Sequence, residues 1–178
     1  MVMIDLITGF LGSGKTTFLK KYAEYLMDQG LHIGILENDF GAINVDMLML
    51  HELRGDQCEL EMIAGGCDAE SHRRRFRTKL ISMRMCGYDR VLVEPSGIYD
   101  VDEFFDVLRE EPLDQWYEIG NVIAILDARL EKNLSQQADY LLASEAANAG
   151  KVILSHADAA TREQCEDTVA HLNRALEQ

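Results

Sequence analysis

The segment GFLGSGKTT, residues 9 to 17, holds residue types that bind phosphate at a fixed spacing. Gly9 and Gly14 bracket four residues, and Lys15 and Thr16 follow at once. Glycines let a loop turn its backbone N–H groups inward without Cβ clashes, a lysine adds positive charge, and a threonine hydroxyl suits Mg²⁺. A glycine turn that contains a lysine by chance is the alternative, but the motif is complete. The spacing therefore predicts a P-loop.

A helix that begins near Ser13 would direct the positive end of its dipole at the same phosphates. The apolar run before the loop and the amphipathic stretch after it supply the strand and helix that a P-loop requires. The residues expected to contact a nucleotide here are Gly9, Leu11, Gly12, Ser13, Gly14, Lys15, Thr16 and Thr17.

The segment VLVEPSG, residues 91 to 97, offers a carboxylate for Mg²⁺. Glu94 follows three apolar residues of strand type and precedes a Pro-Ser-Gly turn. We expect Glu94 to reach the Mg²⁺ together with Thr16, and Gly97 to give a backbone N–H to the γ-phosphate. An ordinary carboxylate at the end of a strand is the alternative.

A second acidic segment, ENDFGAINVD, covers residues 37 to 46. Asp39 and Asp46 lie where a segment that responds to the nucleotide would face it, and Gly41 permits a turn between them. A solvated acidic loop is the competing interpretation.

Apolar runs alternate with helical patterns along the chain. This alternation predicts an α/β sandwich around a mainly parallel sheet, with ligands at the carboxyl ends of the strands. The expected strands are 3–8, 32–37, 90–94, 121–127 and 151–154. The expected helices are 15–29, 70–85, 101–110, 134–148 and 161–176.

Composition limits the classes of protein that the chain can represent. Its 178 residues suit one domain, residues 1–178. The formal net charge of −14 disfavours nonspecific binding to nucleic acid or to anionic membrane. Apolar runs are of strand length and no leader sequence is visible, so we expect a cytoplasmic protein that does not enter the membrane. Four cysteines without close pairing predict free thiols.

Together these segments resemble the CobW/HypB/UreG-type GTPases, in particular the CobW-like branch. The resemblance rests on GFLGSGKTTFL, on ENDFG followed by Asp46, on GGC at 65–67, on VLVEPSGIYD and on ILSHAD. It implies a P-loop NTPase fold of SIMIBI type, a three-layer sandwich that hydrolyses GTP with Mg²⁺. It also implies a metallochaperone or metallocofactor-assembly switch, a client metalloprotein and nucleotide-linked homodimers.

In that scheme the catalytic residues are Lys15, Asp39, Asp46 and Glu94. Lys15 and the loop amides hold charge that develops on the phosphates, and Glu94 helps to organise Mg²⁺. Asp39 or Asp46 positions water or metal. The switch segments fall near residues 37–46 and 94–100.

The sequence departs from the family pattern at its metal motif. CobW-like proteins usually carry Cys-x-Cys-Cys, whereas GGCDAESH keeps Cys67 and has Ala69 and Glu70 at the other two positions. Cys67 with Asp68, Glu70 or His72 could hold zinc or another transition metal, or Cys67 is a small loop residue without metal. A tight thiolate-rich site is not expected.

The base motif also departs from the family pattern. Asn-Lys-x-Asp selects guanine in the family, and here the four residues are Ser155, His156, Ala157 and Asp158. From the family pattern we expect Asp158 to retain a preference for guanine, and we expect the loss of the Asn and Lys side chains to weaken it. An Asp at this place can instead cap a helix or a turn.

An arginine-rich segment, SHRRRFRTK at 71–79, has two interpretations. It is either a solvated helix face or the source of an arginine that reaches phosphate across a dimer. Two other functions stay open: a P-loop kinase for a small molecule, with this helix as a lid, and a regulatory module that binds nucleotide without hydrolysis. The family often continues into a C-terminal domain, so the chain is a stand-alone nucleotide domain or part of a longer protein.

Overall fold

The computed structural model describes residues 1–10, 12–39, 45–64, 68–95, 101–131 and 133–177. Within these residues six strands form one sheet in the order β3-β2-β4-β1-β5-β6, and every neighbouring pair is parallel. The strands are β1 Val2–Thr8, β2 Ile33–Asp39, β3 Cys58–Ala64, β4 Arg90–Glu94, β5 Tyr117–Asp127 and β6 Lys151–Ser155.

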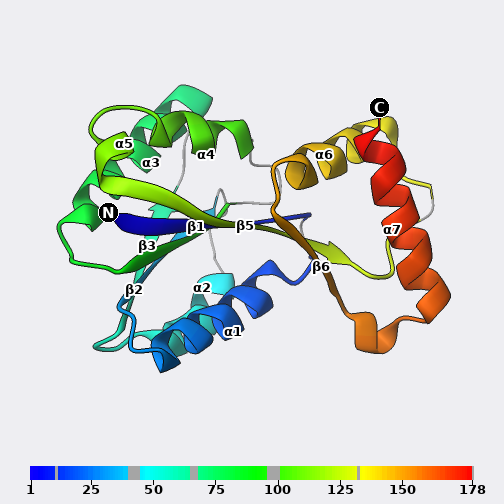
Figure 1. The fold of residues 1–178 in the computed structure, drawn as a ribbon, viewed down its shortest axis with the longest axis horizontal. Coiled ribbons are helices and arrows are strands. Elements are labelled where there is room, and N and C mark those ends of the chain that lie inside the picture. The colour runs from blue at the N-terminus through cyan, green and yellow to red at the C-terminus, as the bar shows by residue number, and fades with distance from the viewer. Residues whose placement is uncertain (11, 40–44, 65–67, 96–100, 132, 178) are drawn as a thin grey trace.

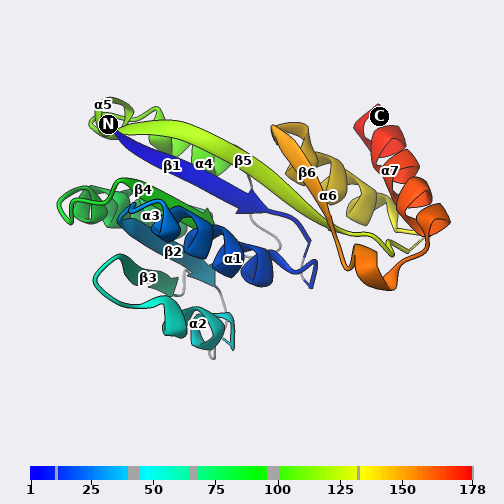
Figure 2. The same cartoon turned by 60° about the horizontal axis from the view of Figure 1, so that its bottom comes forward.

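Helices cover both faces of this sheet (Figure 1). Helices α1 and α2 lie on one face, and α3, α4 and α5 lie on the other. Helices α6 and α7 pack on each other beside β5 and β6, at the far end of the sheet from β3 (Figure 2). The helices are α1 Lys15–Asp28, α2 Val45–Leu50, α3 Ala69–Arg84, α4 Val101–Leu108, α5 Leu113–Trp116, α6 Gln136–Ala147 and α7 Arg162–Leu176, with 3-10 turns at His51–Leu53 and Ala157–Ala159.

The core is divided by the sheet into two apolar layers. Successive residues of β1 point to opposite faces, so Ile7 packs with Leu19 of α1 while Leu6 packs with Phe76 of α3 and Phe104 of α4. These side chains are all buried. A sheet covered on both faces needs strands that are apolar throughout, which explains the continuous Val, Ile and Leu runs of β1 and β4.

The predicted α/β architecture is confirmed, and the structure adds elements that the sequence analysis missed. Strand β3, CELEMIA, alternates acidic and apolar residues instead of forming a continuous apolar run, as suits its place at the edge of the sheet. The short helix α2 was also missed. Strand β5 begins at Tyr117 rather than Asn121, and its first half has a mixed burial pattern.

Because the strands are parallel, their carboxyl ends meet at one edge of the sheet. Thr8, Glu94, Asp127 and Ser155 each end a strand there. In open α/β sheets this edge is where ligands bind. No helix in the described part of the chain is long and apolar enough to cross a membrane.

Candidate functional site

The loop between β1 and α1 requires glycine at its first position. Gly9 has a φ of +134°, and a Cβ built there would lie 2.1 Å from the carbonyl oxygen of Ile125 in β5. Gly14 has a φ of +89° and precedes the first residue of α1, which begins at Lys15 rather than near Ser13. The loop therefore passes directly against β5 before α1 begins. Only glycine, which has no Cβ, allows the two backbones to come this close at Gly9.

Lys15 folds back over this loop. Its Nζ donates to the carbonyl oxygens of Gly9 at 2.8 Å and of Phe10 at 3.0 Å. The residue is 6% exposed, so its positive charge is held inside the loop rather than in bulk solvent. A buried ammonium held by carbonyl groups provides a fixed positive charge for an anionic ligand.

Thr16 and Glu94 meet at the carboxyl edge of the sheet. The Thr16 hydroxyl donates to Glu94 Oε1 at 2.9 Å, and both residues are buried. Thr16 lies in the first turn of α1 and Glu94 ends β4, which is the strand next to β1. The structure thus brings together the hydroxyl and the carboxylate that the sequence analysis assigned to Mg²⁺.

A second carboxylate adjoins this pair. Glu37 in β2 is the register partner of Glu94 in β4 and is 3% exposed. Two buried carboxylates on adjacent strands are costly to desolvate unless a cation or a proton compensates their charge. The hydroxyl and carboxylate oxygens are the hard donors that Mg²⁺ prefers, so this donor set fits the ion.

Ser13 adds a polar group to the loop. Its residue is 4% exposed, and its hydroxyl has no hydrogen-bond partner in the described part of the structure. A buried hydroxyl without a partner is costly, and an oxygen of a bound phosphate would relieve that cost. Thr17, by contrast, is exposed, and Gly12 has a φ of +77° in open space.

Glu145 contacts the loop and was not identified from the sequence. This carboxylate in α6 is 3% exposed and accepts a 3.1 Å hydrogen bond from the backbone N–H of Gly9. Leu142 and Ala146 of the same helix are buried in the adjoining apolar cluster. The sequence signal was a glutamate on the apolar face of a predicted helix, where an acidic residue needs a partner.

The altered base motif lies against the loop. A Cβ built on Gly14 would lie 3.6 Å from Ser155 Cβ and 3.9 Å from His156 Cε1. His156 has a φ of +53°, and its Nδ1 lies 3.0 Å from Asp127 Oδ2 and 3.3 Å from Ser155 Oγ. Ser155 Oγ also donates to the carbonyl oxygen of Leu126 at 3.3 Å. The ends of β5 and β6 therefore place two of the predicted base-binding residues beside the glycine loop.

Asp127 and Asp158 differ in their surroundings. Burial raises the pKa of Asp127, but hydrogen bonds from the Arg129 backbone and side chain, with the charges of Arg129 and His156, leave this pKa below its ordinary value. Asp127 is therefore a stable anion next to His156 at neutral pH. Asp158 lies in the 3-10 turn after β6 and is exposed, so its carboxylate is accessible to a ligand.

Several predicted site residues lie outside the description. Leu11, Cys67 and Gly97 are not among the described residues, and the side chains of Asp39 and Asp46 are not described either, although Asp39 ends β2 and Asp46 lies in α2. Their roles stay predictions. Among the residues that the structure describes, no three His, Cys, Asp or Glu side chains come together as metal ligands, so the donor set described for Mg²⁺ consists of two carboxylates and one hydroxyl.

This arrangement, a glycine loop between β1 and α1 with Lys15 held inside it, defines a P-loop nucleotide-binding domain. A model of the CobW/HypB/UreG nucleotide-binding domain matches residues 3–178, and the chain belongs to that family. The family that the sequence resembled is thereby confirmed.

Two of the curated relatives are zinc chaperones from Escherichia coli. Zinc chaperone YjiA is 28% identical over 186 aligned positions, which cover 97% of this chain and 55% of YjiA. Zinc chaperone YeiR is 31% identical over 157 positions, which cover 85% of this chain and 47% of YeiR. The chain thus spans about half the length of these relatives.

Solved structures share the fold. The Zn(II)-bound YjiA GTPase from E. coli superposes with a TM-score of 0.58 at 21% identity, over 96% of this chain and 54% of that one. The hydrogenase maturation factor HypB from Archaeoglobus fulgidus superposes with a TM-score of 0.56 at 17% identity, over 98% and 76%. At these identities the superpositions support the three-layer P-loop fold.

Proposed function

We propose that this domain binds GTP with Mg²⁺ and hydrolyses it, as the nucleotide-dependent part of a metal-delivery protein. The observation that carries the proposal is the hydrogen bond between Thr16 and Glu94 at the carboxyl edge of the sheet, beside a loop that holds Lys15. Hydroxyl, carboxylate and ammonium at one strand edge are the groups that phosphoryl transfer to water requires.

Different residues of the chain are proposed to hold the phosphates and the ion. Lys15 and the N–H groups at the start of α1 would hold the phosphates and stabilise the charge that develops on them during transfer. Thr16 and Glu94 would hold the ion, and Glu37 would add a second carboxylate close to it. Mg²⁺, when bound, would supply positive charge to the β- and γ-phosphates.

Asp39 and Asp46 are proposed to position the attacking water or a metal. This assignment rests on their place in the sequence, Asp39 as the last residue of β2 and Asp46 in α2 after it, because the end of β2 adjoins the end of β4 in the sheet. Residues that move when the γ-phosphate leaves are commonly found in such segments.

The base is proposed to be guanine, with modest discrimination. The exposed carboxylate of Asp158 can accept from the ring N–H and the amino group of guanine, and Ser155 and His156 lie against the glycine loop. The His156 ring is directed to Asp127 by a 3.0 Å contact, so it is not free to pack over a base as a lysine stem would.

The metal delivered is proposed to be zinc. Support comes from the names of the relatives YjiA and YeiR as zinc chaperones. The retained Cys67 is the proposed thiolate, and a site with one thiolate binds zinc weakly enough to release it to a client.

Phosphate release from GTP tests the proposal directly. We expect slow, Mg²⁺-dependent turnover without any acceptor molecule, and no turnover when EDTA removes the ion. A small-molecule kinase would need an acceptor, and a regulatory module would bind GTP and release no phosphate. Phosphate transfer only when an acceptor is added, or GTP binding without phosphate release, would overturn the proposed hydrolysis.

A further inference from the structure

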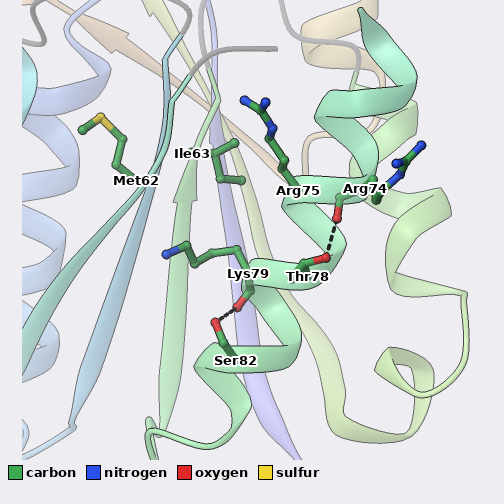
Figure 3. Close-up of a pocket in the computed structure, with 7 residues that line it drawn as sticks. All are labelled: Met62, Ile63, Arg74, Arg75, Thr78, Lys79 and Ser82. Atoms are coloured by element: carbon green, nitrogen blue, oxygen red, sulfur yellow. Dashed lines mark hydrogen bonds between the residues drawn. The ribbon is translucent and has the colours of Figure 1, made fainter.

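The arginine-rich segment of α3 pairs with carboxylates of the domain itself. Arg73 and Arg77 both bind Glu110, which follows α4, at 2.6 Å and 3.0 Å. Lys79 binds Glu61 of β3 at 2.7 Å and lines the groove between α3 and β3 that Figure 3 shows. Because these carboxylates neutralise them, the three cations offer little positive charge to an external anion.

His156 places a titratable ring beside the glycine loop. Its Cε1 lies 3.9 Å from the point where a Cβ on Gly14 would stand, and Ser155 Cβ lies 3.6 Å from the same point. Gly14 is the N-cap residue of α1, and the backbone N–H groups of a P-loop at this place turn towards phosphate. Since Cε1 is the carbon between the two ring nitrogens, the polar edge of the ring is the edge next to the loop.

The contacts of His156 decide which ring nitrogen can titrate. Nδ1 lies 3.0 Å from Asp127 Oδ2 and 3.3 Å from Ser155 Oγ. The Ser155 hydroxyl donates its single proton to the Leu126 carbonyl oxygen, and Asp127, an anion at neutral pH, can only accept. Nδ1 therefore carries a proton. Nε2, which has no hydrogen-bond partner in the described part of the chain, is the nitrogen that gains or loses one.

Asp127 holds this ring from a fixed position. The Arg129 backbone N–H donates to Asp127 at 2.8 Å, and the Arg129 Nε and Nη2 lie 3.3 Å and 3.4 Å from its carboxylate oxygens. The His156 side chain is 43% exposed, so little packing restrains it apart from these polar contacts. The contact with Asp127 therefore determines which way the ring faces.

Protonation of Nε2 changes the net charge next to the loop. Asp127 and neutral His156 together carry one negative charge, and with the imidazolium they carry none, so protonation removes a repulsion from the phosphates of a nucleotide. Further charged groups lie at the end of β5, after β5, after β6, in the loop and on α6. They are Asp127, Arg129, Asp158, Lys15 and Glu145.

We propose that Asp127 positions His156 beside the glycine loop as a titratable cation for the phosphates of a bound nucleotide, and that binding therefore tightens as the pH falls from about 8 to about 6. This proposal rests on the proposed function only in requiring that the loop bind a nucleotide. It depends neither on hydrolysis nor on guanine, because GDP and ADP carry the same phosphates.

The test measures GDP and ADP affinities by isothermal titration with Mg²⁺ at about pH 8 and about pH 6. Each affinity is divided by that of His156→Asn at the same pH, so the protonation of the nucleotide itself cancels. Asparagine suits the left-handed backbone at this position, where φ is +53°, and has no charge to titrate. We expect the wild-type ratio to rise about threefold or more from the higher to the lower pH, for both nucleotides.

Two variants separate charge from structure. His156→Lys carries a fixed positive charge, so its ratio should be high at both pH values. His171→Asn is the matched control, because His171 also pairs with an aspartate, Asp139, at 2.6 Å between α7 and α6. Its ratio should rise as the wild-type ratio does.

The positioning role of Asp127 has its own pair of variants. Asp127→Asn keeps an oxygen that accepts from Nδ1, so the ring stays oriented and most of the rise should remain. Asp127→Ala removes that oxygen, and the rise should largely disappear. Circular dichroism checks that both variants fold.

A flat wild-type ratio, with GDP and ADP still bound, would overturn the role of His156 and leave the proposed function intact. A rise with GDP alone would contradict an action on the phosphates. Equal rises in wild type and folded Asp127→Ala would overturn positioning by Asp127. If the wild type bound neither nucleotide at either pH, both this proposal and the proposed function would fail.

Discussion

Thr16 and Glu94 share a 2.9 Å hydrogen bond although 78 positions separate them in the chain. The contact exists because β4 lies next to β1 in the sheet, so the end of one strand adjoins the helix that follows the other. Since both residues are buried, the carboxylate reaches the hydroxyl without competition from bulk water. This geometry accounts for the proposed Mg²⁺ site and makes it testable.

Glu94→Gln should leave GTP binding largely intact and remove its dependence on Mg²⁺. The amide keeps the shape of the side chain and an oxygen for the Thr16 hydroxyl, but it lacks the negative charge that attracts the ion. Isothermal titration with GTP, with and without Mg²⁺, measures the dependence, and phosphate release measures turnover. If both match the wild type, Glu94 is only a carboxylate at the end of a strand.

Replacing Glu145 tests its hydrogen bond to the glycine loop. Glu145→Ala leaves the buried Gly9 N–H without its acceptor, so we expect a loss of about 1–3 kcal/mol in the free energy of unfolding and weaker GTP binding. Glu145→Gln keeps a carbonyl acceptor and should lie closer to wild type. The exposed Glu24→Ala in α1 is the control. Urea unfolding gives the free energies, and equal values for all three variants would mean that Glu145 does not support the loop.

The ratio of GTP to ATP dissociation constants tests the base assignment. A base without guanine's donors would leave the Asp158 carboxylate unpaired, which costs about 1–3 kcal/mol when such an acceptor is buried. Because Asp158 is exposed, that penalty is smaller here. We therefore expect a modest preference for GTP. Ser155→Asn with His156→Lys should widen it, and Asp158→Ala should erase it. A wild-type preference for ATP would refute the guanine assignment.

The protein purified without added metal should contain less than one zinc per chain, because Cys67 lacks neighbouring thiolates. Cys58 begins β3, and the other end of that strand lies about 20 Å away. Burial, with a smaller effect of the Glu59 charge, also raises the pKa of Cys58 to about 11, so its thiol stays protonated at neutral pH. Elemental analysis of the purified protein measures its zinc content. One zinc per chain that is lost in Cys67→Ser would contradict the expected low zinc content.

Local signals in the sequence predicted the part of the site that one segment or one strand end can define. Gly9, Lys15 and Glu94 carry a motif or follow an apolar run, so their place at the carboxyl edge could be inferred before the fold was known. Strand β3 could not be recognised as an apolar run because Glu59 and Glu61 interrupt its apolar residues.

Contacts that depend on tertiary packing were not predictable from local patterns. Glu145 reaches Gly9 across 136 positions because α6 packs against β5 and the loop, and no local pattern encodes that approach. The pairing of His156 with Asp127 likewise depends on a left-handed backbone at His156 and on the adjacency of β5 and β6. Both contacts depend on the order of the strands in the sheet, and sequence periodicity does not specify that order.

The most direct test of the proposed nucleotide site is the thermal stabilisation that GTP with Mg²⁺ gives to wild type and to Lys15→Ala, each compared with its own ligand-free protein. A ligand that binds the native state must raise its apparent stability, and Lys15 supplies the charge inside the loop. The exposed Lys21→Ala on the same helix controls for loss of a positive charge. We predict a clear rise in Tm for wild type and Lys21→Ala and almost none for Lys15→Ala, whereas an equal rise in all three would contradict the P-loop assignment.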